Sequence, residues 1–223
     1  MTITFLSTSQ LLSLLRNDTD HYYKTFTTYD LRARNVNTVD EYIKRVCLHF
    51  LSHSENYRKK LDKIQEKIER YIGVIDELFS TFSKPWFNGK RAAKIPWKIA
   101  YLPTRKVYES GLPHTRGKNV IVLTSSRNLF STLVHEKVHL YQKKYPKDVE
   151  LYLSEKGFEK VRKREERDRI RANPDIDEWI YKKGTRVYKY VYTSASPKTI
   201  EDVDGKYEHP REEMAEEIEK LIR

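Results

Sequence analysis

Two histidines four residues apart, with a glutamate after the first, constrain this chain more than any other feature. They are His135, Glu136 and His139, in the sequence STLVHEKVHLYQKKYP of residues 131–146. Residues four apart lie on one face of an α-helix, so both imidazoles can reach a single ion. Glu136 is turned by about 100° from His135 and can reach a water on that ion without ligating it. The pattern predicts a helix whose site is completed by a ligand from elsewhere in the chain.

This arrangement is typical of a catalytic zinc site. Such a site has three protein ligands and leaves one position for water, whose pKa the zinc lowers to about 7. We therefore expect Zn²⁺ on His135 and His139, with Glu136 as the base that accepts the proton of the water and later passes it to the leaving amine. The alternative is a core helix with two hydrogen-bonded histidines, but that interpretation does not explain a glutamate within an apolar stretch.

The C-terminal stretch KYEHPREEMAEEIEKLIR is the best source of the third ligand. HEKVHLYQ and HPREEMAEE resemble the two motifs of the gluzincin class of zinc metallopeptidases, especially its minimal single-domain members. The resemblance implies His135, His139 and Glu212 as the zinc ligands and Glu136 as the general base. It also implies that Glu216, one turn after Glu212, is an acid that steadies a ligand histidine.

The ligand assignment has alternatives. The helical spacing does not decide between Glu212 and three neighbouring acids, namely Glu213, Glu216 and Glu217. His209 stands where many relatives have asparagine and is a further candidate ligand.

The resemblance also implies a protein or peptide substrate and a donor that stabilises the tetrahedral oxyanion. Tyr207 is the nearest candidate, with alternatives in the preceding hairpin: Tyr188, Tyr190 and Tyr192. We expect the strand NVIVL, residues 119–123, to run along the cleft and to hydrogen-bond an extended peptide.

The remaining patterns predict an α+β fold that is mainly helical, with a zincin-like catalytic domain and a small mixed sheet. Thr38 and Glu41 form a capping-box pattern, and apolar residues three and four apart predict one long helix over residues 54–82. Further predicted elements are a strand at 98–102, a helix at 127–144 capped by Ser125 or Ser126, a helix at 148–171, a hairpin at 179–192 and a helix from Pro210. The helical pattern stops at Pro85, so we expect a helical N-terminal region at 1–83 and the metallopeptidase domain at 84–223. The apolar stripe of the first region must pack either on that domain or on a second copy of the protein.

Positive charge is concentrated in one stretch of the chain. Lysine and arginine exceed aspartate and glutamate by 43 − 32 = 11, and residues 84–118 hold nine basic residues and one acid. Five aromatic residues are interleaved with them: Trp86, Phe87, Trp97, Tyr101 and Tyr108. Phosphate contact and base stacking use such a mixture, so we expect nucleic-acid contact here, through Lys90, Arg91 and Lys94. The alternative is a basic surface whose aromatic residues pack beneath it.

The single cysteine, Cys47, excludes an internal disulfide. The first residues lack a basic leader and a small-residue cleavage site, and no apolar run approaches the roughly 18 residues that span a bilayer. The sequence therefore predicts an intracellular protein of the cytoplasm or nucleus, not secreted and not in a membrane. Three functions fit: a zinc-dependent endopeptidase, which the resemblance favours, a nucleic-acid-associated protease, or a non-catalytic zinc-containing protein that binds DNA or protein.

Overall fold

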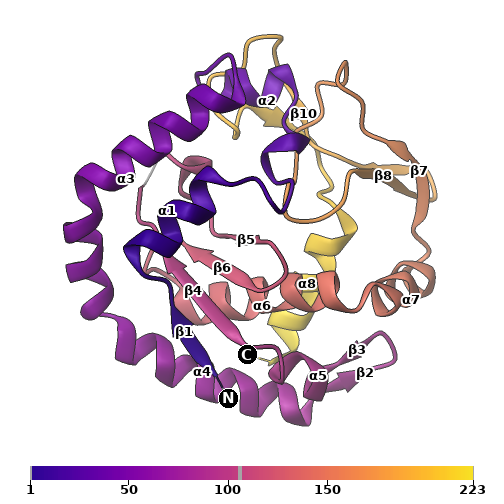
Figure 1. Ribbon diagram of the computed structural model, residues 1–223. Coiled ribbons are helices and arrows are strands. Elements are labelled where there is room, and N and C mark those ends of the chain that lie inside the picture. Colours follow the sequence, from indigo (N-terminus) through magenta and orange to yellow (C-terminus); the bar gives the residue numbers. More distant parts are fainter. Residues whose placement is uncertain (1, 105–106, 223) are drawn as a thin grey trace.

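This computed structural model describes residues 2–104 and 107–222. The predicted α+β class is confirmed, because helices surround a small mixed sheet (Figure 1). The helices are α1 (Thr8–Arg16), η1 (Tyr23–Thr25), α2 (Thr28–Ala33), α3 (Val39–Asp62), α4 (Gln65–Thr81), α5 (Gly89–Ala93), η2 (Glu109–Gly111), α6 (Leu129–Lys144), α7 (Pro146–Lys156) and α8 (Pro210–Ile222). The strands are β1 (Ile3–Phe5), β2 (Ser83–Lys84), β3 (Phe87–Asn88), β4 (Trp97–Tyr101), β5 (His114–Arg116), β6 (Val120–Leu123), β7 (Glu159–Lys163), β8 (Trp179–Lys183), β9 (Arg186–Tyr188), β10 (Val191–Tyr192) and β11 (Val203–Asp204).

The central sheet has the strand order β1-β4-β6-β5. β1 and β6 flank β4 in parallel, and β5 runs antiparallel to β6 at the edge. The first strand of the expected N-terminal region therefore pairs directly with a strand of the expected catalytic domain. The two regions share one sheet.

Alternate residues of the central strands enter two different cores. Ile99 and Ile121 pack into the cluster formed with α4, α6 and α8, whereas Ala100 and Val122 pack into the cluster formed with α1 and α3. Successive residues of a strand point to opposite faces of a sheet, so this alternation places helices on both faces. In Figure 1, α3 and α4 follow one another around the outside of the sheet.

The helix expected over residues 54–82 is two helices. The predicted capping box of Thr38 and Glu41 is present and begins α3. α3 ends at Asp62 and α4 begins at Gln65, so the apolar stripe continues across a break that contains no proline or glycine. The break lets both halves of the stripe reach the core, with Tyr57 in one cluster and Ile68 in the other.

The helix expected over 148–171 is wrong in its second half. α7 ends at Lys156 because Gly157 adopts φ of 74°, and residues 159–163 then form β7. The predicted hairpin is confirmed by β8 and β9, with β7 as a third antiparallel strand. Its second strand ends at Tyr188, however, and Val191 and Tyr192 form β10, which pairs with β11. The serine cap of α6 is also wrong: the cap residue is Asn128, at φ of 48° and without a side-chain capping hydrogen bond.

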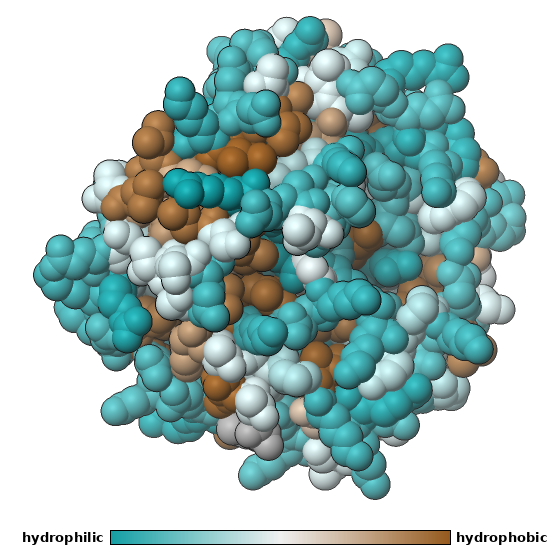
Figure 2. All heavy atoms as spheres, viewed as in Figure 1, coloured by the Kyte–Doolittle hydropathy of each residue, from teal (hydrophilic) through white to brown (hydrophobic). Residues whose placement is uncertain are grey.

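The surface is mostly hydrophilic on the right half of the face in Figure 2, where β7 and β8 lie in Figure 1. The hydrophobic residues visible on this face gather mainly in its upper left part. Within the described residues, no helix combines the length and apolar character needed to cross a bilayer.

Candidate metal centre

α6 presents its histidine pair to α8 because its other side belongs to the core. Leu133, Val134 and Val138 are fully buried in the cluster that includes the central sheet. α6 packs against α8 along the remaining face. His139 is 2 % exposed at this contact, and His135 is half-buried beside it.

The start of α8 is fixed by contacts that exclude His209 from the metal-binding group. The His209 Nδ1 accepts a hydrogen bond from the backbone N–H of Arg211 at 3.2 Å, and its Nε2 lies 3.0 Å from Asp177 Oδ1. Both ring nitrogens are therefore occupied. Pro210 opens the helix, as predicted, and Glu212 follows within its first turn.

His135, His139 and Glu212 converge on one point although the sequence separates them by up to 77 residues. Glu212 Oε2 lies 3.0 Å from the Nε2 of His135 and 3.2 Å from the Nε2 of His139, and the two nitrogens are 3.0 Å apart. Among the described residues, none of the three competing acids joins the histidines in a group of potential metal ligands.

The geometry of these three atoms fits a zinc ion. Zinc–ligand bonds of about 2.0–2.1 Å in a tetrahedron hold the ligand atoms roughly 3.3–3.4 Å apart. The observed separations of 3.0–3.2 Å are only slightly shorter. A small outward movement of the three side chains would therefore accommodate the metal. Two imidazoles and one carboxylate are also a ligand set that suits zinc.

Gln142 selects the tautomer of His139 that can bind a metal. Its Nε2 donates to the backbone oxygen of Arg211 at 2.8 Å, so its Oε1 is left to accept from His139 Nδ1 at 3.0 Å. A proton on Nδ1 leaves the Nε2 lone pair of neutral His139 directed toward His135 and Glu212. Gln142, at 1 % exposure, thus also ties α6 to the first turn of α8.

Glu212 and the two imidazoles stabilise each other's charges. Burial lowers the pKa of His139, but the carboxylate of Glu212 outweighs this effect and raises that pKa to about 10. Burial also raises the pKa of Glu212, yet the two imidazoles hold it well below its usual value. The group therefore behaves as a buried carboxylate that attracts positive charge, which a divalent cation would supply.

Glu136 differs from these ligands in having an oxygen without a partner. The residue is 3 % exposed and its Oε2 forms no hydrogen bond within the described residues. Burial raises its pKa to about 7, although His139 and His135 act in the opposite direction. A carboxylate with this pKa can exchange a proton near neutral pH, as a general base requires.

The acid beside His135 is Glu219 and not the expected Glu216. Glu219 Oε2 lies 3.6 Å from His135 Nδ1. Glu216 instead pairs with Lys220 at 3.0 Å in an exposed i, i+4 contact, although it also lines the cavity. The acid that steadies a ligand histidine was predicted at Glu216, about one helical turn before Glu219 on α8.

A second set of polar residues near Glu136 has no signal in the sequence. Asp175 belongs to a group with Glu136 and His139 whose potential ligand atoms lie within 4.8 Å of one another. The backbone N–H and the hydroxyl of Thr115 donate to Asp175 Oδ2 at 3.2 and 3.3 Å. Lys143 Nζ donates to the Thr115 hydroxyl at 2.7 Å. These contacts join β5, α6 and the segment before β8 behind the candidate base.

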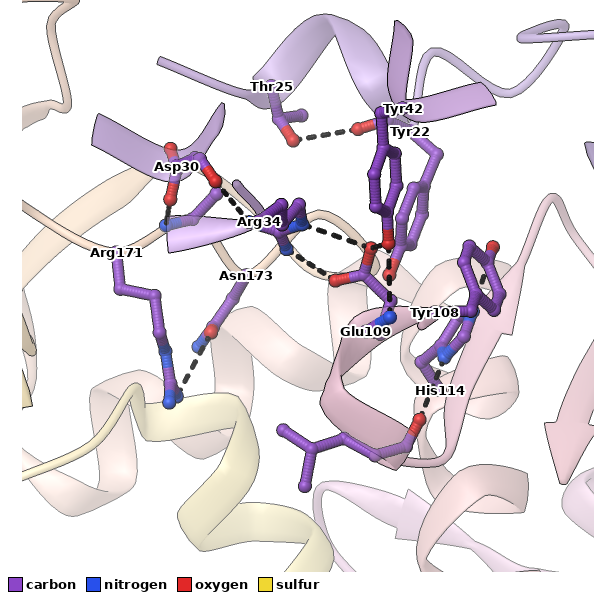
Figure 3. Close-up of polar contacts among 12 residues, drawn as sticks. Tyr22, Thr25, Asp30, Arg34, Tyr42, Tyr108, Glu109, His114, Arg171 and Asn173 are labelled. Carbon is purple, nitrogen blue, oxygen red and sulfur yellow. Dashed lines mark hydrogen bonds and ion pairs between the residues drawn. The ribbon is translucent and has the colours of Figure 1, made fainter. Parts of the chain in front are cut away.

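The candidate ligands and Glu136 open into a cavity of about 440 Å³. The expected N-terminal region forms part of its wall through Tyr22 and Arg34, and Arg171 and Asn173 line another part. Figure 3 shows how Arg34 is held: its guanidinium pairs with buried Glu109, and its Nη1 donates to the backbone oxygen of Asp30 at 3.0 Å. The wall is therefore built from both halves of the chain.

Tyr207 does not line this cavity. Its ring packs against Tyr188 at 5.2 Å and faces a different groove. The alternatives also serve other contacts: Tyr188 and Tyr192 are buried, and Tyr190 lies under the guanidinium of Arg171. The donors that do line the cavity include Tyr22, His114, Arg171 and Asn173.

β6 is not available to a peptide substrate, contrary to the sequence expectation, because β4 and β5 pair with it on both sides. The edge strand is β5, and side chains already cover its outward backbone groups. Asp175 accepts from the N–H of Thr115, Lys143 donates to the oxygen of Thr115, and Asp20 accepts from the N–H of Gly117.

The basic segment 84–118 lacks the aromatic surface that base stacking requires. All five of its interleaved aromatic residues are buried, from 0 % exposure for Phe87 and Tyr108 to 8 % for Tyr101. Lys90 and Lys94 are exposed, whereas Arg91 is paired with Asp148 at 2.6 Å. Arg105 and Lys106 lie outside the described residues. The burial of these rings agrees with the alternative, in which the aromatic residues pack beneath a basic surface.

Comparisons with protein-family models, with curated proteins and with solved structures found no match to this chain.

Proposed function

We propose that this chain is a zinc-dependent metallopeptidase that hydrolyses peptide bonds in a protein or peptide substrate. The observation that carries the proposal is the convergence of His135, His139 and Glu212 beside Glu136, whose buried Oε2 is unpartnered among the described residues. A structural zinc site closes its coordination with four protein ligands. Here three candidate ligands open into a cavity. Asp175 groups with Glu136 and His139 but not with His135 and Glu212, so it does not complete the set as a fourth ligand.

The residues of the cavity supply the proton transfers of amide hydrolysis. Zinc, when bound, would lower the pKa of a water molecule and polarise the peptide carbonyl. Glu136 accepts one proton as the water oxygen adds to the carbonyl carbon, and then gives this proton to the amide nitrogen as the C–N bond breaks. The second proton of the water leaves the new carboxyl group for the amine, so the products are a carboxylate and a protonated amine. Gln142 holds His139 in the required tautomer throughout.

Replacing Glu136 by glutamine tests the proposal most directly. Glutamine has nearly the same shape but cannot accept a proton, so peptide cleavage should fall by at least about 100-fold. Zinc content, measured by elemental analysis, should stay near one ion per chain. Cleavage would be followed with a mixture of fluorescence-quenched peptides, before and after chelation and zinc addition.

Glu217→Gln is the matched control, because Glu217 lies on α8, pairs with Lys156 at 2.9 Å and is not among the residues that line the cavity. It should keep both zinc and activity. If the Glu136→Gln protein cleaves as fast as the wild type, Glu136 is not the base. A wild-type protein that binds no zinc and cleaves no peptide would rule out the proposal as a whole.

A further inference from the structure

A basic groove lies apart from the candidate metal centre. It has a volume of about 730 Å³ and is bordered by β9, β10, β11 and the turn that follows β11. Among the residues that the structure describes, four exposed cations line it: Arg169, Arg186, Lys189 and Lys206. Asp204 is the one carboxylate among the described residues of its wall.

These cations have no carboxylate partner among the described residues. In the described part of the chain, none of the four forms an ion pair. Three nearby cations, in contrast, are paired: Arg162 with Asp168 at 2.6 Å, Arg171 with Glu208 at 2.7 Å and Lys182 with Glu159 at 2.9 Å. The groove is therefore a local excess of positive charge, with Asp204 as the one acid in its described wall.

The backbone brings these cations together from three separate segments. The turn after β11 lies against residues 189–190, where the N–H of Lys189 donates to the oxygen of Tyr207 at 3.1 Å. Gly205 permits this approach, because a Cβ there would lie 2.5 Å from Tyr190 Cδ1 and 2.6 Å from the oxygen of Lys189. The fold thereby brings Lys206 and Lys189 to the same groove.

Tyr207 orders two of the cations. Arg186 lies 5.2 Å and Lys206 5.5 Å from the centre of its ring, while Tyr188 packs at 5.2 Å. A half-buried tyrosine that holds two cations reduces the freedom that they would lose on binding an anion. The groove is thus partly organised before any ligand arrives.

We propose that this groove binds the phosphate backbone of a nucleic acid. Four like charges around one open groove repel one another, and a linear polyanion relieves that repulsion at several points at once. A nucleic acid carries one charge on every nucleotide, whereas a peptide needs a run of adjacent acids to match it. The chain's net charge of +11 adds a long-range attraction of the same sign. This assignment replaces the contact expected in segment 84–118, and it does not depend on the peptidase activity.

Fluorescence anisotropy of a labelled 20-nucleotide single-stranded DNA, titrated with the full-length protein, tests the proposal. Each phosphate contact with a single strand contributes about −0.7 to the slope of log affinity against log salt. Four contacts give a slope of about −2.8, so affinity should fall about 50-fold between 50 and 200 mM salt. The triple variant Arg169→Ala, Lys189→Ala and Lys206→Ala should reduce the slope by about 2 and weaken binding at 50 mM at least about tenfold.

The control is the double variant Lys90→Ala and Lys94→Ala, which removes two exposed cations of the other basic segment. It should bind nearly as the wild type does. Asp204→Asn removes the acid of the groove and should tighten binding. Circular dichroism and zinc content check that every variant is folded.

Three results would overturn the proposal. The first is a wild-type protein that does not bind the oligonucleotide at 50 mM salt. The second is a triple variant that binds like the wild type while the Lys90 and Lys94 variant is weakened. The third is polyglutamate displacing the oligonucleotide at equal charge concentration as effectively as unlabelled DNA, which would assign the groove to acidic peptides.

Discussion

Glu212 and Glu216 lie one helical turn apart on α8, yet the structure gives them different partners. Glu212 contacts both histidines, whereas Glu216 contacts Lys220. Loss of a partner that only orients a ligand usually costs 10–100-fold in metal affinity. Glu212→Ala removes a ligand itself, so zinc affinity should fall by more than about 100-fold. Competition with a chromogenic chelator measures this loss.

Glu216→Ala is the matched variant for that measurement, since it makes the same change on the same helix. It should keep its zinc affinity within about threefold, because its exposed ion pair contributes little. Equal losses in both variants would show that the change acts through α8 as a whole and not through ligation.

At the scale of residues, the sequence is informative where contacts are local. Helical spacing places His135, Glu136 and His139 correctly, since three to four residues of one helix determine the face they share. Asp175 could not be found in this way. Its place beside Glu136 depends on Thr115 of β5, 60 residues away, and on Lys143. Glu219 was missed because the rotation of α8 about its axis is set by packing against α6.

Among the elements, α8 depends on Asp177 for its position. The carboxylate lies 3.0 Å from His209 Nε2 and 2.8 Å from Arg211 Nη2, and it accepts the hydroxyl of Tyr181 of β8 at 2.9 Å. Asp177→Asn leaves these groups partly unpaired, so the free energy of unfolding at pH 7 should fall by about 2–4 kcal/mol. Asp168→Asn, which loosens the more exposed pair with Arg162, should cost less than about 1 kcal/mol.

The difference between wild type and Asp177→Asn should depend on pH. Burial raises the pKa of Asp177, but His209 and Arg211 more than offset this and hold it well below the usual 3.8. Because the folded pKa is lower than the unfolded one, the stabilisation is complete above about pH 5 and is lost progressively as the pH falls from there through the folded pKa. Urea unfolding at pH 7, 5 and 3.5 measures it. A variant as stable as the wild type at pH 7 would contradict the anchoring role.

Element types were predictable where a strong local signal agrees with the tertiary structure. The capping box of α3, the hairpin of β8 and β9 and the proline start of α8 all belong to this class. The ends of the elements were less predictable. The helical pattern continues past Gly157, but the left-handed backbone there ends α7, and pairing with β8 then makes the next segment a strand. The break before α4 follows from the shape of the core that the two helices enclose.

For the whole molecule, the expected division near residue 83 does not separate two packing units. β1 belongs to the central sheet, and Tyr22 and Arg34 line the cavity of the candidate metal centre. The apolar stripe was expected to pack either on the rest of this chain or on a second copy of the protein. In the structure it packs on the same chain, because residues of α4 share one core with α6 and α8. The sequence could not decide this, since periodicity identifies a buried face but not what covers it.

The contribution of α4 to this shared core can be measured with two substitutions on one helix. Ile72 is fully buried, whereas Val74, two residues later, is 42 % exposed. Ile72→Ala should lower the free energy of unfolding by about 2–5 kcal/mol, because it leaves a cavity between α4 and the rest of the core. Val74→Ala should change it by less than about 0.5 kcal/mol. Urea unfolding of the metal-free proteins gives both values.

Removal of residues 1–83 extends the same argument. It strips four fully buried side chains of α4 from the core: Ile68, Ile72, Ile75 and Phe79. At about 1.5–3 kcal/mol each, their loss of about 6–12 kcal/mol is comparable to the entire stability of a domain. The remaining fragment, with the β4 edge also uncovered, should be insoluble or inactive when expressed alone. Co-expression with residues 1–83 should restore soluble protein that binds zinc, because the two pieces rebuild one sheet and one core. A soluble, zinc-loaded and active fragment beginning near Lys84 would contradict the shared core and would make the first 83 residues a separate module.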